Sequence, residues 1–188
     1  MPTPKEALRK LIAGNETYIK SSKNPADISG ARIAETAKHG QTPYAAILTC
    51  SDSRVPPEHI FTAGLGELFV IRTAGNVAGD LEIGSMEFAV RNLSVPVAVI
   101  MGHTQCVAVA AALAEKPEGY RGSVLLEIQA GINGANEADA VRSNALNTKR
   151  RIVQSEIIKA AVESGRLLVV CAEYDINTGR VEFWDLGK

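Results

Sequence analysis

Cysteine is scarce in this 188-residue chain, which contains three: Cys50, Cys106 and Cys171. An odd number at wide spacing does not make the paired framework of a small disulfide-stabilised secreted protein. In a reducing compartment, cysteines spaced in this way are better interpreted as metal ligands, a nucleophile or buried core residues.

An excess of one charge is also missing, and so is a long hydrophobic run. Lys and Arg number 20 against 21 Asp and Glu, for a formal net charge of −1, so we expect no nucleic-acid partner. No run approaches the roughly 18 apolar residues of a membrane helix. Charges recur every few residues in the segment 1–20, which argues against a secretory signal. We therefore expect a cytoplasmic protein with no membrane partner.

What the chain does contain is a succession of short apolar runs separated by helix-length segments. With 46% hydrophobic residues, the chain suits one domain, 1–188, whose first 30 residues form a helical arm and a loop. Strands are expected at 45–49, 68–72, 97–101, 167–172 and, as a sheet edge, 180–184. Helices are expected at 4–20, 81–93, 104–115 and 147–163, and 117–146 is also interpreted as helical. Continuous apolar strands between helices predict an α/β fold with a mainly parallel β-sheet flanked by helices.

Side chains that can bind a metal follow two of these apolar runs. Cys50 closes the run 45–49, and the sequence "HTQC" after the run 97–101 supplies His103 and Cys106. Ligands of open α/β sheets bind beyond the carboxyl ends of the strands. Helix N-terminal amides also favour a thiolate at Cys106. Two sulfurs and one nitrogen are typical of a catalytic zinc site that keeps one coordination position open.

Other interpretations of these residues stay open. Isolated cysteines are commonly buried and inert, so the three side chains can be unrelated core residues. A structural metal site completed by Cys171 is a second alternative, disfavoured because Cys171 lies inside an apolar run. Thiol redox or phosphatase chemistry at Cys50 is a third, disfavoured because Arg54 is too close for a phosphate loop and no second cysteine has a resolving spacing.

Two opposite charges follow Cys50 in the segment "CSDSR". In an extended segment, Asp52 and Arg54 point the same way and pair easily. On the surface such a pair contributes little. Beside a metal, Arg54 can hold the Asp52 carboxylate off the open position by a bidentate hydrogen bond, and Asp52 can orient metal-bound water or hydroxide. Zinc lowers the pKa of that water to roughly 7, although two thiolates and a neutral imidazole should weaken the effect.

The segments "CSDSRVPPEHIF", "GELFVIRTAGN", "GSMEFAV", "GHTQC" and "YDINTGRVEFW" occur in this order and resemble the β-class carbonic anhydrases. The resemblance covers most of the chain from Gln41 to Trp184. It implies a carbonate dehydratase, a lyase with one Zn²⁺ per subunit, which hydrates carbon dioxide reversibly to bicarbonate and a proton through metal-bound hydroxide. By position it implies the zinc ligands Cys50, His103 and Cys106 and the gating pair Asp52 and Arg54, with water or the aspartate as fourth ligand.

The resemblance also implies a substrate pocket. Gln41 falls where the family places a glutamine whose amide binds the substrate, and Phe69, Ala74 and Phe88 fall on positions that line a small apolar pocket. Ordinary core packing is the alternative for Phe69 and Ala74. In the family this pocket is built across a dimer interface and the N-terminal helix packs on the partner subunit, so a homodimer or tetramer is expected.

Several positions depart from the family pattern, and two of them belong to the predicted pocket. Val107 stands where the family usually has glycine, and Phe88 stands where many members have tyrosine. Val107 keeps the backbone N–H that would face the substrate, but its side chain can crowd the pocket. The alternatives are therefore a weakly active or catalytically silent zinc-binding homologue, or a hydrolase of carbonyl sulfide or carbon disulfide.

Overall fold

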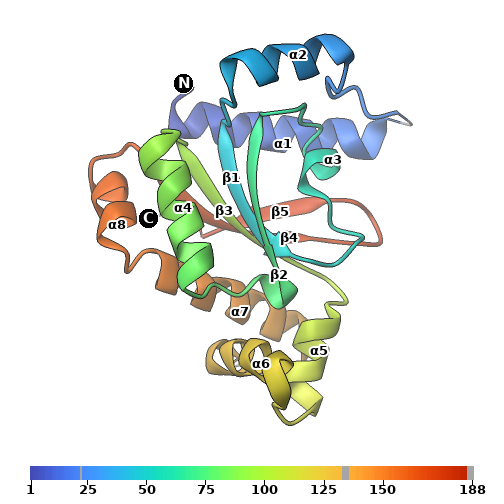
Figure 1. The fold of residues 1–188 in the computed structure, drawn as a ribbon. Coiled ribbons are helices and arrows are strands. Elements are labelled where there is room, and N and C mark those ends of the chain that lie inside the picture. The colour runs from blue at the N-terminus through green and yellow to red at the C-terminus, as the bar shows by residue number, and fades with distance from the viewer. Residues whose placement is uncertain (22, 133–135, 186–188) are drawn as a thin grey trace.

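The computed structural model describes residues 1–21, 23–132 and 136–185, and in this part of the chain a five-stranded sheet forms the centre (Figure 1). Its strands lie in the order β2-β1-β3-β4-β5. They are β1 (Ala45–Cys50), β2 (Leu68–Thr73), β3 (Val97–His103), β4 (Leu168–Tyr174) and β5 (Val181–Trp184). The first four run parallel, and β5 pairs antiparallel with β4. The predicted α/β class and the edge position of the last strand are confirmed.

Helices cover both faces of the sheet (Figure 1). They are α1 (Pro4–Lys20), α2 (Gly30–His39), α3 (Pro57–Ile60), α4 (Asp80–Asn92), α5 (Val107–Ala114), α6 (Gly119–Gly131), α7 (Glu137–Ile152) and α8 (Glu156–Glu163), with a 3-10 turn η1 (Ala74–Asn76). Alternate residues of β1 point to opposite faces, so Leu48 packs with α4, α7 and α8, while Ile47 packs with α1 and α3. Strands buried on both faces explain the continuous apolar runs.

Helix α1 begins at a capping box and packs on the chain's own sheet. Thr3 accepts a hydrogen bond from the Glu6 N–H, and the Glu6 carboxylate accepts one from the Thr3 N–H. Leu11 is buried among the sheet residues. Asn15 donates to the carbonyls of Ile60 and Gly179. The expected contact of this helix with a partner subunit stays a prediction.

We expect the Gly14→Ala variant to be less stable than the wild type, because an added Cβ would clash with the carbonyl oxygen of Phe61. Overpacking of this kind lowers the free energy of unfolding by about 1–3 kcal/mol. Chemical denaturation measures the loss. The matched control is Gly84→Ala on α4, where a Cβ meets nothing within 4 Å. Equal stability of both variants would contradict the tight contact of α1 with α3.

The expected helix 147–163 is wrong, because two helices occupy this region. Helix α7 ends at Ile152, and the Ser155 side chain accepts a hydrogen bond from the Ile158 N–H, which begins α8. The apolar positions on both sides share a spacing that hides this break. Helix α2 had no counterpart among the expected elements, and the helical interpretation of 117–146 matches α6 and the first part of α7, although residues 133–135 lie outside the described residues.

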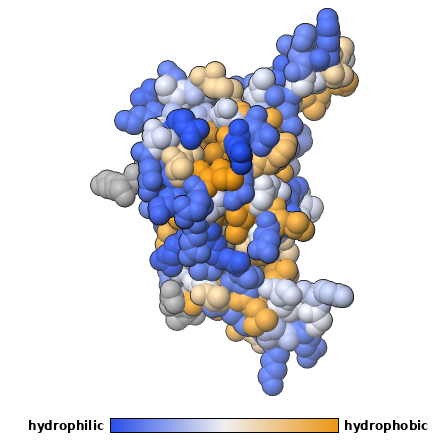
Figure 2. Space-filling model, turned by 60° about the vertical axis from the view of Figure 1, so that its left-hand side comes forward, coloured by the Kyte–Doolittle hydropathy of each residue, from blue (hydrophilic) through white to orange (hydrophobic). Residues whose placement is uncertain are grey.

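Some apolar side chains remain exposed on the surface. Helix α2 buries no residue, and α4 exposes Leu81 and Phe88 to 82% and 51%. Figure 2 turns the side of the molecule that carries α4 forward, and apolar surface lies there between hydrophilic groups. Exposed apolar patches of this kind often mark contact surfaces.

None of the described helices combines the length and the apolar character that crossing a bilayer requires.

Candidate metal centre

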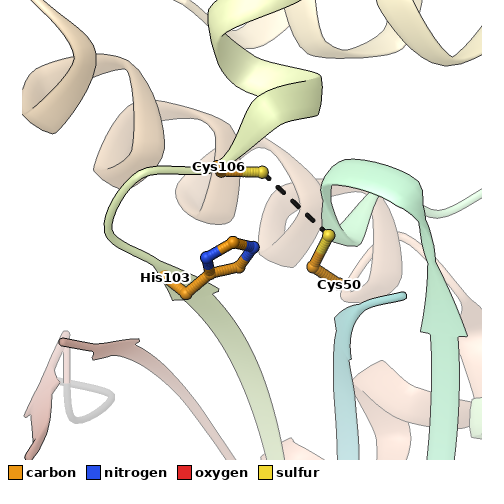
Figure 3. Close-up of side chains that lie close together, drawn as sticks. All are labelled: Cys50, His103 and Cys106. Carbon is orange, nitrogen blue, oxygen red and sulfur yellow. Dashed lines mark hydrogen bonds between the residues drawn. The ribbon is translucent and has the colours of Figure 1, made fainter. Parts of the chain in front are cut away.

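Three side chains from the carboxyl ends of β1 and β3 and the start of α5 converge on one point (Figure 3). Cys50 is the last residue of β1, His103 is the last residue of β3, and Cys106 is the N-cap of α5. Since β1 and β3 are parallel neighbours, their ends lie side by side. The ligand atoms of the three residues lie within 4.8 Å of one another, and all three residues are buried.

The orientation of His103 suits a metal ligand. Its Nδ1–H donates to the carbonyl of Thr104 at 2.9 Å, which leaves Nε2 as the unprotonated nitrogen of the neutral ring. Nε2 is buried and has no hydrogen-bond partner among the described residues. A buried nitrogen without a partner costs stability, whereas a metal ion supplies one. Histidine ligands are commonly oriented by such a bond from the other ring nitrogen.

The sulfurs of the two cysteines lie close enough together to bind the same cation. Their sulfurs lie 4.0 Å apart, and the Gly75 N–H donates to Cys50 Sγ at 3.2 Å. The hydrogen bond between the two thiols is the main cause that lowers the pKa of Cys50. The Cys50 thiolate in turn raises the pKa of Cys106. Two sulfurs with one imidazole nitrogen are a donor set that fits Zn²⁺.

Asp52 and Arg54 form a bidentate pair beside this centre. Arg54 donates through Nε and a terminal nitrogen to the two carboxylate oxygens, at 2.9 and 2.7 Å. These hydrogen bonds are the main cause that lowers the pKa of Asp52 to about 2. Asp52 Oδ2 lies 3.9 Å from His103 Nε2. The carboxylate therefore lies next to the candidate metal ligands as a charged acceptor.

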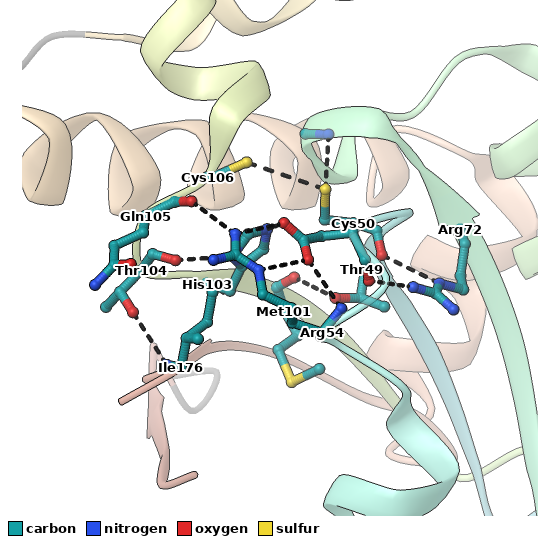
Figure 4. Close-up of polar contacts among 12 residues, drawn as sticks. Thr49, Cys50, Arg54, Arg72, Met101, His103, Thr104, Gln105, Cys106 and Ile176 are labelled. Atoms are coloured by element: carbon teal, nitrogen blue, oxygen red, sulfur yellow. Dashed lines mark hydrogen bonds and ion pairs between the residues drawn. The ribbon is translucent and has the colours of Figure 1, made fainter. Parts of the chain in front are cut away.

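The local backbone differs from the extended segment that was expected between Asp52 and Arg54. The Arg54 N–H donates to Asp52 Oδ1 at 2.9 Å, so the chain turns here and the carboxylate caps the turn. Arg54 also donates to the carbonyl of Gln105 at 3.1 Å (Figure 4). Arg72 from β2 donates to the carbonyls of Cys50 and Asp52 at 3.1 and 2.6 Å. The pair is therefore held by the loop after β3, through Gln105, and by Arg72 of strand β2.

Cys171 takes no part in this cluster. It lies in β4, where its side chain packs with residues of α4, α7 and α8 and donates to the carbonyl of Ala145. Burial raises its pKa to about 12. The group of ligand atoms found in the described residues contains Cys50, His103 and Cys106 only. This placement argues against the alternative of a structural site completed by Cys171.

A cavity of about 320 Å³ opens beside the metal centre. Of the residues predicted for the substrate pocket, Ala74 and Val107 line this cavity, together with Cys50 and Asp52; its role as a substrate pocket stays a prediction. Gln41, Phe69 and Phe88 are not among its lining residues in this single chain. Gln41 is exposed after α2, and the rings of Phe69 and Phe88 stack on each other with centroids 6.4 Å apart.

The sequence prediction missed most of the walls of this cavity. The further lining residues are Ser51, Ala108, Ala111, Arg121, Val124 and Leu125. Ala108 and Ala111 are three residues apart on α5, a spacing that places two small side chains on one face of a helix. The sequence could have indicated the α5 wall of the cavity through this spacing. It could not indicate Arg121, Val124 and Leu125, because these residues reach the cavity only through the packing of α6 on α5.

Comparison with known proteins agrees with the motifs. The family model described as carbonic anhydrase matches residues 45–181. The crystal structure of the β-carbonic anhydrase CafA of Aspergillus fumigatus superposes with a TM-score of 0.71 at 32% identity, over 84% of this chain and 83% of that chain. The chain belongs to the β-carbonic anhydrase family.

Other relatives span almost the whole of this β-carbonic anhydrase. Carbonic anhydrase 2 of Mycobacterium tuberculosis is 34% identical over 195 residues, which cover 97% of this chain and 93% of that protein. The carbonic anhydrase of Mycolicibacterium smegmatis is 33% identical over 193 residues, which cover 95% and 92%. The family assignment and the enzyme class predicted from the motifs, a lyase of the carbonic anhydrase type, are confirmed.

Proposed function

We propose that this β-carbonic anhydrase catalyses the zinc-dependent, reversible hydration of carbon dioxide to bicarbonate and a proton. Cys50, His103 and Cys106 would hold one Zn²⁺ per chain. The observation that carries the proposal is the convergence of these three ligand atoms beside the Asp52–Arg54 pair. When bound, zinc lowers the pKa of water to roughly 7 and so supplies hydroxide near neutral pH.

The remaining chemistry belongs to residues of the chain. A carboxylate whose pKa lies at about 2 is charged at neutral pH, so Asp52 can accept a hydrogen bond from the attacking oxygen and orient it. Arg54 grips both oxygens of Asp52 and keeps the carboxylate from taking the fourth position at the metal. The apolar walls of the cavity, such as Ala74 and Leu125, suit a substrate without a dipole.

Stopped-flow hydration with a pH indicator tests the proposal. Purified, zinc-loaded protein at a pH above 8 should accelerate the hydration of carbon dioxide. Removal of zinc by a chelator should abolish the acceleration, and added zinc should restore it. A zinc-loaded protein with no acceleration would contradict the proposed activity and favour a zinc-binding homologue without catalysis.

We expect replacement of Val107 by glycine to change kcat/KM for carbon dioxide by less than about 10-fold. The reason is that the side chain is 72% exposed, at the rim of the cavity. Val107→Ala separates side-chain volume from the backbone freedom of glycine. Hydration of carbon dioxide and hydrolysis of carbonyl sulfide and carbon disulfide are measured for all three proteins. A hundredfold gain in hydration by both variants would mean that Val107 blocks the natural pocket, and the alternative substrates would then be favoured.

We also propose that the working unit is a homodimer or tetramer. Phe88 is half exposed and α2 buries no residue in its own chain, which is consistent with surfaces completed by a second copy. Gln41, Phe69 and Phe88 would then line the pocket together with the partner. Sedimentation equilibrium tests the assembly, and a monomer at micromolar concentration would contradict it. The cytoplasmic location and the division into one domain with an N-terminal arm stay predictions.

A further inference from the structure

The turn η1 has a backbone conformation that needs support. Gly75 and Asn76 both lie in the left-handed region, with φ of 67° and 46°, which is uncommon for a residue with a side chain. An added Cβ at Gly75 would lie 2.6 Å from Cδ1 of Ile128. This conformation directs the Gly75 N–H to Cys50 Sγ at 3.2 Å. The left-handed turn therefore supplies a hydrogen bond to one of the candidate metal ligands.

Helix α7 supplies the support for this turn. The Asn144 amide donates to the carbonyl of Gly75 at 2.7 Å, and the Thr148 hydroxyl donates to the carbonyl of Asn76 at 3.1 Å. The two residues are one helical turn apart and point the same way. Both are buried, Asn144 completely. Figure 1 shows η1, at the end of β2, next to α7.

The burial of Asn144 lowers the stability of the fold more than a residue with only a packing role would. Its Oδ1 is buried and has no hydrogen-bond partner among the described residues, and its Nδ2 bonds to Gly75. An unpaired buried oxygen costs stability, and an apolar side chain would avoid that cost. Departures of this kind from good packing concentrate at functional sites.

We propose that Asn144 is a positioning residue for the candidate metal centre. Its hydrogen bond to the Gly75 carbonyl holds Gly75 in the left-handed conformation, and this conformation directs the Gly75 N–H to Cys50 Sγ. The inference rests on the proposed zinc site. The hydrogen bond from the Gly75 N–H fixes the direction of Cys50 Sγ, so its loss should leave this sulfur less well oriented toward a cation. Residues that orient metal ligands in this way affect metal affinity and activity about 10- to 100-fold. Asn144 thus acts through Gly75 and touches neither metal nor substrate.

The test compares Asn144→Asp with Asn15→Asp. Asn144→Asp keeps the shape of the side chain but removes the N–H donor to Gly75. Asn15 is the matched control, because its buried amide also donates to backbone carbonyls, from α1 on the opposite face of the sheet. Zinc affinity is measured by competition with a chelator, the thiolate-to-metal charge-transfer band is recorded after cobalt substitution, and thermal melting follows stability.

We expect Asn144→Asp to lower the affinity for zinc about 10- to 100-fold and to shift the cobalt charge-transfer band, while Asn15→Asp changes only the melting temperature. Thr148→Val, which weakens the same turn, should show a smaller effect in the same direction and serves if Asn144→Asp does not fold. Wild-type zinc affinity and cobalt spectrum in the Asn144 and Thr148 variants would overturn the inference. If the wild-type chain itself bound no zinc, the proposed function would fail instead.

Discussion

Replacement of Cys106 by serine is expected to remove most of the zinc from the purified protein. Cys106 Sγ is one of the three candidate ligand atoms that lie within 4.8 Å of one another. A serine hydroxyl is a poor substitute for a thiolate at zinc. Residues that merely orient ligands cost about 10- to 100-fold in affinity when they are changed, so the loss of a ligand should exceed the upper end of this range. Hydration activity should fall with the zinc content.

The matched control is Cys171→Ser, which makes the same chemical change at a buried cysteine in β4. This control should keep one zinc per chain, because Cys171 packs among residues of α4, α7 and α8. Metal analysis after dialysis against a weak chelator gives the stoichiometry. Full zinc occupancy in Cys106→Ser would remove this residue from the ligand set. Loss of zinc in Cys171→Ser would favour the alternative of a structural metal site completed by Cys171.

Replacement of Arg54 by alanine should leave zinc bound and lower hydration about 10- to 100-fold, the range for residues that orient a metal site. Without the bidentate bonds at 2.9 and 2.7 Å, the Asp52 carboxylate is free to turn to the cation, since its Oδ2 already lies 3.9 Å from His103 Nε2. A carboxylate in the fourth position excludes water. Stopped-flow hydration and zinc analysis of the same sample measure the two effects separately.

Two further variants define the role of Arg54. Arg54→Lys keeps the positive charge but lacks the fork that grips both oxygens, so it should recover only part of the rate. Arg142→Ala removes an arginine that pairs with Glu173 and Glu182, and it should hydrate carbon dioxide at the wild-type rate. Wild-type hydration by Arg54→Ala would show that Asp52 needs no restraint. Loss of zinc would instead assign Arg54 a structural role, through its bond to Gln105.

The strands and the convergence of the candidate metal ligands were predictable for the same physical reason. A strand covered on both faces is apolar along its whole length, so β1 and β3 are visible as runs that end where polar chemistry begins. Cys50 and His103 stand at those ends, and neighbouring parallel strands bring their ends together. The break between α7 and α8 was not predictable in this way, because the apolar spacing continues past the Ser155 cap.

The walls of the cavity and the support of the turn η1 depend on packing between distant segments. Arg121 and Leu125 reach the cavity because α6 packs beside α5, and the spacing of residues within α6 contains no information on that contact. Asn144 is a polar residue in a polar stretch of sequence, which is typical of an exposed position, yet it is completely buried against η1. Both results follow from contacts that form only when the chain folds.

The sequence by itself determined the β-carbonic anhydrase family, the α/β sheet and the identity of the candidate zinc ligands, because these depend on residue type and on local order along the chain. Only the tertiary structure decided which nitrogen of His103 faces the sulfurs, how Arg54 holds Asp52 and which residue supports the Gly75 N–H. These are matters of direction and distance between segments that lie far apart in the sequence, and packing of the whole chain sets them.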